Sequence, residues 1–206
     1  MQDIEKALES ITDIRNQIAL GRMFRGFGPA VIGLTGLFAV MLTAAQLLWP
    51  QELAASNFAL LGWWIFAAVL SVIIIGIEMF ALSRRYHGGL AGSMISNAVQ
   101  TFLPIGAAGS VIGLIILMNT PELAWILPGI WQVLIAIGIF SSLKFLPNPI
   151  VIPGAWYFLA GTAVLLLGSQ NIALSPLAMG IPFAVGQGLM AIILFKTLEV
   201  SENGSR

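Results

Sequence analysis

The chain has 206 residues, of which 58% are hydrophobic and only 9% are charged. A soluble domain carries about 25% charged residues, so this composition excludes a water-exposed surface and predicts a protein covered by lipid. The formal net charge is zero, which gives no electrostatic support for a nucleic-acid partner. The chain has no cysteine, which excludes disulfides, thiol catalysis and cysteine metal sites.

Residues 1–26 differ in character from the rest of the chain. Apolar residues recur at helical spacing, acidic residues come early and arginines come late, an order that suits the helix dipole. We therefore predict an amphipathic cytoplasmic helix over residues 2–22. It docks under the bundle, lies on the membrane or recruits a cytoplasmic protein.

Six apolar runs follow, and each is long enough to cross a hydrocarbon core of about 30 Å. They cover about residues 27–49, 57–82, 99–118, 123–143, 152–169 and 176–197. These runs predict an all-α fold, a polytopic bundle of six transmembrane helices over residues 27–198, with residues 199–206 as a cytoplasmic tail. Glycines at the start of segment 88–98 favour a flexible or interfacial stretch there.

The nine Lys and Arg residues all fall on one side of this bundle, in the segments before the first, third and fifth spans and at or after the end of the sixth. The positive-inside rule predicts that this side is cytoplasmic, with both termini there. Aromatic residues near the span ends, including Trp156 and Tyr157 at the inner boundary, are typical of an aromatic belt at the membrane interface.

Prolines and glycines divide the six spans into three similar hairpins. Outward helices begin near Gly28-Pro29, Leu103-Pro104 and Ile152-Pro153, and they end near Pro50, Pro121 and Pro176. The return helices carry Gly62, Pro128-Gly129 and Pro182. The pattern predicts three α-hairpin repeats, although prolines near span ends are also ordinary in unrelated helices.

This arrangement resembles the acid-resistance membrane protein family of six-helix bacterial inner-membrane proteins. The resemblance covers the spans and not residues 1–26. It implies a bacterial cytoplasmic membrane and a role in membrane homeostasis, with no catalytic residue to transfer.

Two glutamines, Gln132 and Gln187, lie about ten residues into their spans, near the middle of the membrane. An amide is costly in hydrocarbon, so each side chain is expected to face the bundle. Each follows a proline by four or five residues, and broken helices with polar groups are typical of transporters. With the neighbouring Trp131, these residues are candidates for lining a ligand site. The alternative is that they form hydrogen bonds that hold the helices together.

Glu78 is the only acid inside an apolar run. An ionisable residue within a membrane is a functional candidate by default. It follows Asn57 by about 31 Å of helix, which places it near the cytoplasmic interface. It is therefore either an interfacial carboxylate paired with Arg84 or Arg85, or a proton or cation site.

Small residues at four-residue spacing predict close helix packing in two spans. They are Gly109 and Gly113 in the third, and Gly180, Ala184 and Gly188 in the sixth. The spacing suits contacts within one chain and contacts between copies equally, so a homo-oligomer stays open.

The sequence contains no motif of an enzyme that we can identify. It has a single histidine, His87, no phosphate-binding loop and no zinc motif, so neither a cofactor nor an enzymatic activity is expected. The leading hypothesis is a membrane protein that binds or transports a small or lipid-like molecule. The alternatives are a membrane anchor that recruits a partner through residues 2–22, and an ion or proton path that uses Glu78.

Overall fold

The structure is a computed structural model that describes residues 28–87, 91–143, 146–168 and 175–203. Within these ranges the chain is almost entirely helical and contains no strand. The predicted amphipathic helix over residues 2–22 lies outside the described residues.

Seven α-helices and two short 3-10 helices make up the described chain. In order they are α2 (Pro29–Leu48), α3 (Pro50–Leu53), α4 (Asn57–His87), α5 (Ala91–Asn119), η2 (Pro121–Ile126), α6 (Leu127–Ser142), η3 (Asn148–Ile150), α7 (Val151–Gly168) and α8 (Pro176–Asn203). Four of these nine helices begin at a proline, whose fixed φ angle and missing N–H suit the first helical position.

Six helical segments are long and apolar enough to cross a membrane, which confirms the predicted number of spans. They are Pro29–Leu48, Asn57–Leu82, Ile95–Asn119, Pro121–Ser142, Asn148–Gly168 and Pro176–Glu199. Their ends differ from the predicted ends by a few residues. This is the architecture of an integral membrane protein.

Of the two alternatives for residues 88–98, a flexible stretch and an interfacial one, the described part excludes the flexible one. Helix α5 already begins at Ala91 and continues through Pro104 to Asn119. A proline removes one backbone hydrogen bond but does not have to end a membrane helix, because neighbouring groups satisfy the freed carbonyl.

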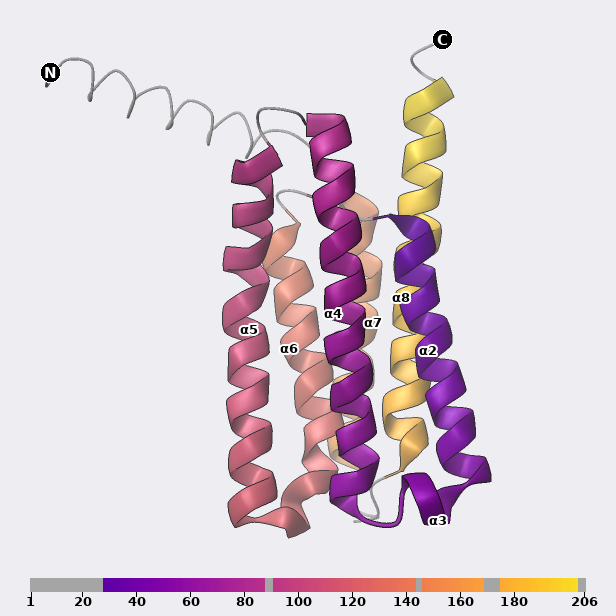
Figure 1. Cartoon of the computed structure of the whole chain (residues 1–206), viewed down its shortest axis with the longest axis vertical. Helices are drawn as coiled ribbons and strands as arrows, with labels where there is room; N and C mark the ends of the chain where they lie inside the picture. Colours follow the sequence, from indigo (N-terminus) through magenta and orange to yellow (C-terminus); the bar gives the residue numbers. More distant parts are fainter. Residues whose placement is uncertain (1–27, 88–90, 144–145, 169–174, 204–206) are drawn as a thin grey trace, which may run out of the picture.

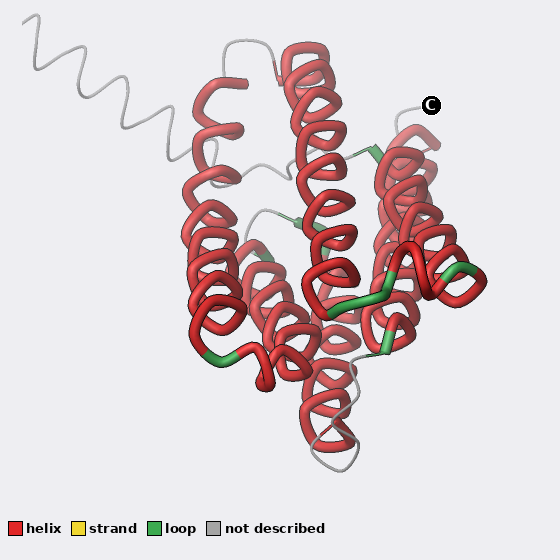
Figure 2. Tube along the Cα trace, turned by 60° about the horizontal axis from the view of Figure 1, so that its bottom comes forward, coloured by secondary structure: helices red, strands yellow, loops and turns green. Residues whose placement is uncertain are grey.

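The six long helices form a closed ring (Figures 1 and 2). Each packs against its neighbour in the chain, and α2 closes the ring by packing against α8. The pairs α2–α8 and α6–α7 have the most extensive contacts. The first and last spans therefore lie side by side.

The two ends of the ring differ in charge. Helix α2 begins, and α4 and α8 end, at the upper end in Figure 1. This end, called the basic end below, carries every Lys and Arg of the described ranges: Arg84, Arg85 and Lys196. The opposite end, called the far end, carries Glu52 on α3 and Glu122 on η2.

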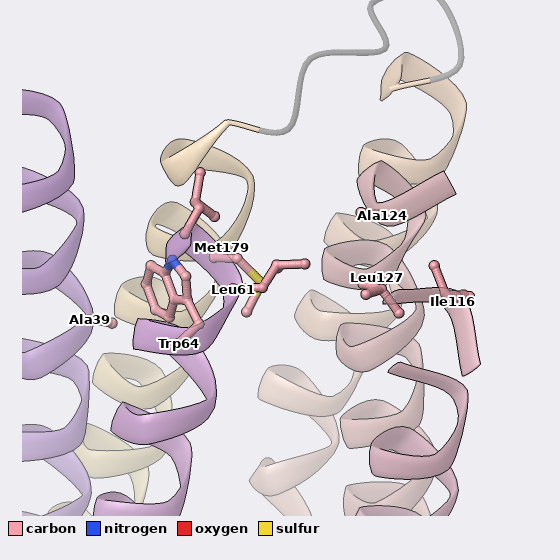
Figure 3. Close-up of a cluster of buried hydrophobic side chains, with 8 residues drawn as sticks. Ala39, Leu61, Trp64, Ile116, Ala124, Leu127 and Met179 are labelled. Atoms are coloured by element: carbon pink, nitrogen blue, oxygen red, sulfur yellow. The ribbon is translucent and has the colours of Figure 1, made fainter. Parts of the chain in front are cut away.

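Two separate clusters of buried side chains fill the ring. The far-end cluster draws on α2, α4, α5, α6, α8 and η2 (Figure 3), and contains Ala39, Leu60, Leu61, Trp64, Ile116, Ala124, Leu127 and Met179. The basic-end cluster contains Ile32, Ala136, Ile139, Leu146, Ile150, Tyr157 and Leu194. None of its buried members comes from α4 or α5.

Glycines allow the close approach of the two tightest helix pairs. At the α6–α7 contact, a Cβ on Gly129 would lie 2.9 Å from the carbonyl oxygen of Gly161, and a Cβ on Gly161 would lie 2.8 Å from that of Gly129. At the α2–α8 contact, Gly36 faces the Cβ of Gln187. Because no side chain separates these backbones, the four helices form the most tightly packed part of the ring.

Candidate functional site

A proline in α8 creates the first polar feature of the bundle interior. Pro182 has no N–H, so the carbonyl of Ala178, one turn earlier, loses its usual helical donor. The Nε2 group of Gln132 on α6 donates to this carbonyl oxygen at 2.7 Å. Gln132 therefore compensates for the hydrogen bond that Pro182 removes.

Only the Nε2 group of the Gln132 amide takes part in this contact. The side chain is completely buried, and its Cβ faces Gly161 across the α6–α7 seam. Its Oε1 atom has no hydrogen-bond partner among the described residues. The carbonyl half of the amide is thus available to a donor that the structure does not contain.

A second polar pair lies between α7 and α8. The ring of Tyr157 is completely buried, and its hydroxyl end lies against Gly186 and beside the side chain of Gln187. The Tyr157 hydroxyl and the Gln187 amide interact with each other, although their contact falls short of ideal hydrogen-bond geometry. The Tyr157 ring also packs edge-on against Phe183, with 5.6 Å between ring centroids.

This placement corrects the prediction that Tyr157 and Trp156 belong to an interfacial belt. Gly186 leaves room for the phenol ring inside the bundle, so Tyr157 points inward. Trp156 donates from its indole Nε1 to the carbonyl oxygen of Pro182 at 2.9 Å. Both aromatic residues thus belong to contacts between α7 and α8.

Gln132, Tyr157 and Gln187 form what we call the polar cluster. Gly161, which contacts Gln132, follows Tyr157 by four residues on α7, so Gln132 lies about one helical turn of 5.4 Å away from the Tyr157–Gln187 pair along the bundle. Three adjacent helices, α6, α7 and α8, therefore contribute buried polar atoms to the interior.

Gln46 shows how the same bundle satisfies a buried amide completely. Its Nε2 donates to the carbonyl oxygen of Leu60 at 3.0 Å, and its Oε1 accepts from the indole Nε1 of Trp64 at 3.0 Å. In the sequence Gln46 cannot be told from an interfacial glutamine, because it lies near the end of its span. It joins α2 to α4 and has little capacity left for a ligand.

Glu78 lies apart from the polar cluster. Its Oε2 accepts from the backbone N–H of Gly28 at 3.2 Å, at the start of α2. A carboxylate in this place interacts favourably with the positive end of the helix dipole. Gln187 contacts α2 at Gly36, eight residues or about 12 Å further along the helix. The structure therefore gives Glu78 a capping role and does not bring it to the glutamines.

Trp131 lies at the contact between α5 and α6. Its indole Nε1 donates to the carbonyl oxygen of Gly109 at 3.0 Å, and its ring lies against Gly113. The two glycines thus leave space for the indole against α5. Trp131 therefore packs α6 against α5 and does not line the polar cluster.

The small residues of α8 differ in how closely they approach α2. A Cβ on Gly36 would lie 3.6 Å from the carbonyl oxygen of Ala184 and 3.8 Å from the backbone nitrogen of Gly188. A Cβ on Gly180 would collide with Thr43, whereas a Cβ on Gly188 would meet no atom within 4 Å. The close approach is therefore made at Gly36 and Gly180.

The chemistry of the polar cluster is neutral. Its groups are two amides and a phenol, and the described residues contain no group of three or more His, Cys, Asp or Glu side chains that could hold a metal ion. Such a set can donate and accept hydrogen bonds but offers no charge. Comparison of the chain with protein families, curated proteins and solved structures gave no match.

Proposed function

We propose that this protein binds a small uncharged molecule at the polar cluster, inside a six-helix bundle of a bacterial cytoplasmic membrane. The observation that carries the proposal is the buried Oε1 of Gln132, which has no hydrogen-bond partner among the described residues, one helical turn from the imperfectly paired Tyr157 and Gln187. Binding there serves transport or retention of the molecule and supports membrane homeostasis.

The energetic argument is that unpaired buried polar atoms are expensive. Each costs about 1–3 kcal/mol, and native structures contain few of them. The complete pairing of Gln46 shows that this fold can satisfy a buried amide when no ligand is involved. A ligand with hydrogen-bond donors would pair the two amide oxygens, and the Tyr157 hydroxyl both donates and accepts.

The orientation belongs to the same proposal. The charge of the basic end suits the cytoplasmic side, so the termini and the amphipathic segment 2–22 are assigned to the cytoplasm. Three hairpin repeats are consistent with the ring, in which α2–α4, α5–α6 and α7–α8 are neighbouring pairs.

The proposal is tested by replacing Gln187 with leucine. Native mass spectrometry of the protein in a mild detergent should show a small molecule retained by the wild type and reduced at least tenfold in Gln187→Leu. Because the contact of Gln187 with the Tyr157 hydroxyl falls short of ideal geometry, its loss should change the thermal unfolding temperature by no more than a few degrees.

The matched control is Gln100→Leu, which removes an exposed glutamine whose side chain bonds only to Ser96 Oγ. This variant should retain the small molecule as the wild type does. A Gln187→Leu protein that unfolds at a lower temperature and retains the molecule would contradict the proposal, because Gln187 would then be a structural residue.

A further inference from the structure

One side of α4 points away from the other helices in its basic-end half. Ile73, Ile77 and Phe80 recur at spacings of three and four residues, so they share one side of the helix. Their exposed fractions are 52%, 68% and 49%. Glu78, which reaches α2 at Gly28, lies about 100° or more around the helix from each of them. These three residues, called the outer stripe below, therefore face the membrane.

The outer stripe ends in a cation. Arg84 follows Phe80 by four residues, and its guanidinium lies over the Phe80 ring, 4.2 Å from the ring centroid. The apolar span of α4 ends at Leu82, so Arg84 lies where the helix leaves the hydrocarbon. Arg84 is exposed, and within the described part of the chain it makes this ring contact and no ion pair. No described carboxylate therefore neutralises its charge.

The contact with Phe80 prepares Arg84 to bind an anion. Because the Phe80 side chain has no conventional hydrogen-bond acceptor, the contact leaves the N–H donors of the guanidinium to other partners. Two of these donors can bind two oxygens of one phosphate in parallel. The ring also restricts the rotamers of Arg84 before a ligand arrives, which lowers the entropy that is lost on binding.

The length of the outer stripe matches one leaflet of a bilayer. Ile73 lies eleven residues before Arg84, which is about 16 Å along the helix. Half of a hydrocarbon core of about 30 Å is about 15 Å. A lipid whose phosphate binds Arg84 would thus place its acyl chains along the outer stripe. An anionic headgroup fits best, because a zwitterionic headgroup already carries its own cation.

We propose that Arg84 and the outer stripe form a binding site for one anionic phospholipid, whose phosphate accepts hydrogen bonds from the guanidinium. Phe80 is a positioning residue, because it holds Arg84 at the membrane surface. The site lies on the outside of the ring and is separate from the polar cluster on α6, α7 and α8. It therefore goes beyond the proposed function and does not depend on it.

The probe for the test is phosphatidylglycerol with a photoreactive diazirine in one acyl chain, a minor component of phosphatidylcholine vesicles that contain the full chain. Phosphatidylcholine with the same diazirine is the reference probe. After illumination, peptide mass spectrometry measures how much each probe labels residues 73–80. The anionic probe should label this segment on the order of fivefold more than the reference, as expected for one arginine near a membrane surface.

Arg84→Gln removes the charge and should bring the labelling ratio of the two probes close to one. The matched control, Lys196→Gln, removes an exposed charge from α8 at the same end and should keep the wild-type ratio. Equal labelling by both probes in the wild type, or an unchanged ratio in Arg84→Gln, would overturn the proposal. An equal loss in both variants would also overturn it, since the anion would then respond to the charge of the whole basic end.

Two substitutions that keep the outer stripe apolar test the role of Phe80. Phe80→Leu lacks the aromatic face and should lower the labelling ratio about twofold, whereas Phe80→Trp keeps an aromatic face and should retain the wild-type ratio. If Phe80→Leu also retains that ratio, Phe80 does not position Arg84, and this part of the proposal is overturned.

Two further outcomes would assign the site to another occupant. If dissolved glycerol phosphate displaces the anionic probe, Arg84 binds a free phosphate without the outer stripe. If Ile77→Trp converts a dimer into a monomer, the outer stripe packs against a second copy of the chain. Either result would overturn the phospholipid site. We expect neither displacement by glycerol phosphate nor a change of oligomeric state.

Discussion

At the scale of single residues, a proline in α8 leaves a backbone carbonyl without its helical hydrogen bond, and a side chain from another helix replaces that bond. Pro182 leaves the carbonyl of Ala178 without a helical donor, and Gln132 supplies one from α6. This contact favours the structural interpretation for the Nε2 half of Gln132, whereas its unpaired Oε1 favours a ligand. One amide therefore serves both interpretations that the sequence left open.

The dependence of Gln132 on Pro182 can be measured with a double-mutant cycle. In a Pro182→Ala background residue 182 regains its N–H and can pair with Ala178, so Gln132→Leu should cost about 1 kcal/mol less than in the wild type. Removal of Oε1 is common to both backgrounds and cancels. Unfolding free energies in one detergent provide the measurement, and equal costs in the two backgrounds would show that the contact contributes nothing.

The sequence could indicate Gln132 and Gln187, because amides deep in an apolar run have few explanations. It could not indicate Tyr157. A tyrosine near a span end matches the interfacial belt, and its inward direction depends on Gly186 from another helix. A position on one helix does not reveal the gap that a neighbouring helix leaves for it.

At the scale of helices, the lengths of the apolar runs and the positions of the prolines were sufficient to predict the six spans. They were not sufficient to predict which helices pack against each other. Gly109 and Gly113 attracted attention because they are four residues apart on one face. The glycines of the tightest seam, Gly129 and Gly161, belong to different helices and have no spacing signature.

Alanine substitutions should separate packed glycines from free ones. In Gly129→Ala the new Cβ would lie 2.5 Å from Leu165 Cγ and 2.9 Å from the carbonyl oxygen of Gly161, so the α6–α7 seam has to open. We expect a loss of about 1–3 kcal/mol in unfolding free energy. Gly76→Ala on α4 meets no atom within 4 Å and should change stability by less than about 0.5 kcal/mol. Similar losses in both variants would contradict the assignment of α6–α7 as the tight pair.

At the scale of the whole molecule, the ring joins strong and weak contacts in a definite order. The tight pairs α2–α8 and α6–α7 are linked through α7–α8, and α4 and α5 complete the ring with less extensive contacts. The polar cluster lies on the more tightly packed side of this ring, on α6, α7 and α8.

The orientation that we propose for this ring from its charge is directly measurable, because the chain has no cysteine. Glu52→Cys at the far end and Glu199→Cys near the basic end replace exposed residues. In intact bacterial cells an impermeant maleimide should label the first variant only, and the second should react after permeabilisation. The physical reason is the cost of translocating clustered Lys and Arg residues, which would hold the basic end in the cytoplasm. The opposite labelling would overturn the proposed orientation, and labelling of both variants in intact cells would show that the chain inserts in two orientations.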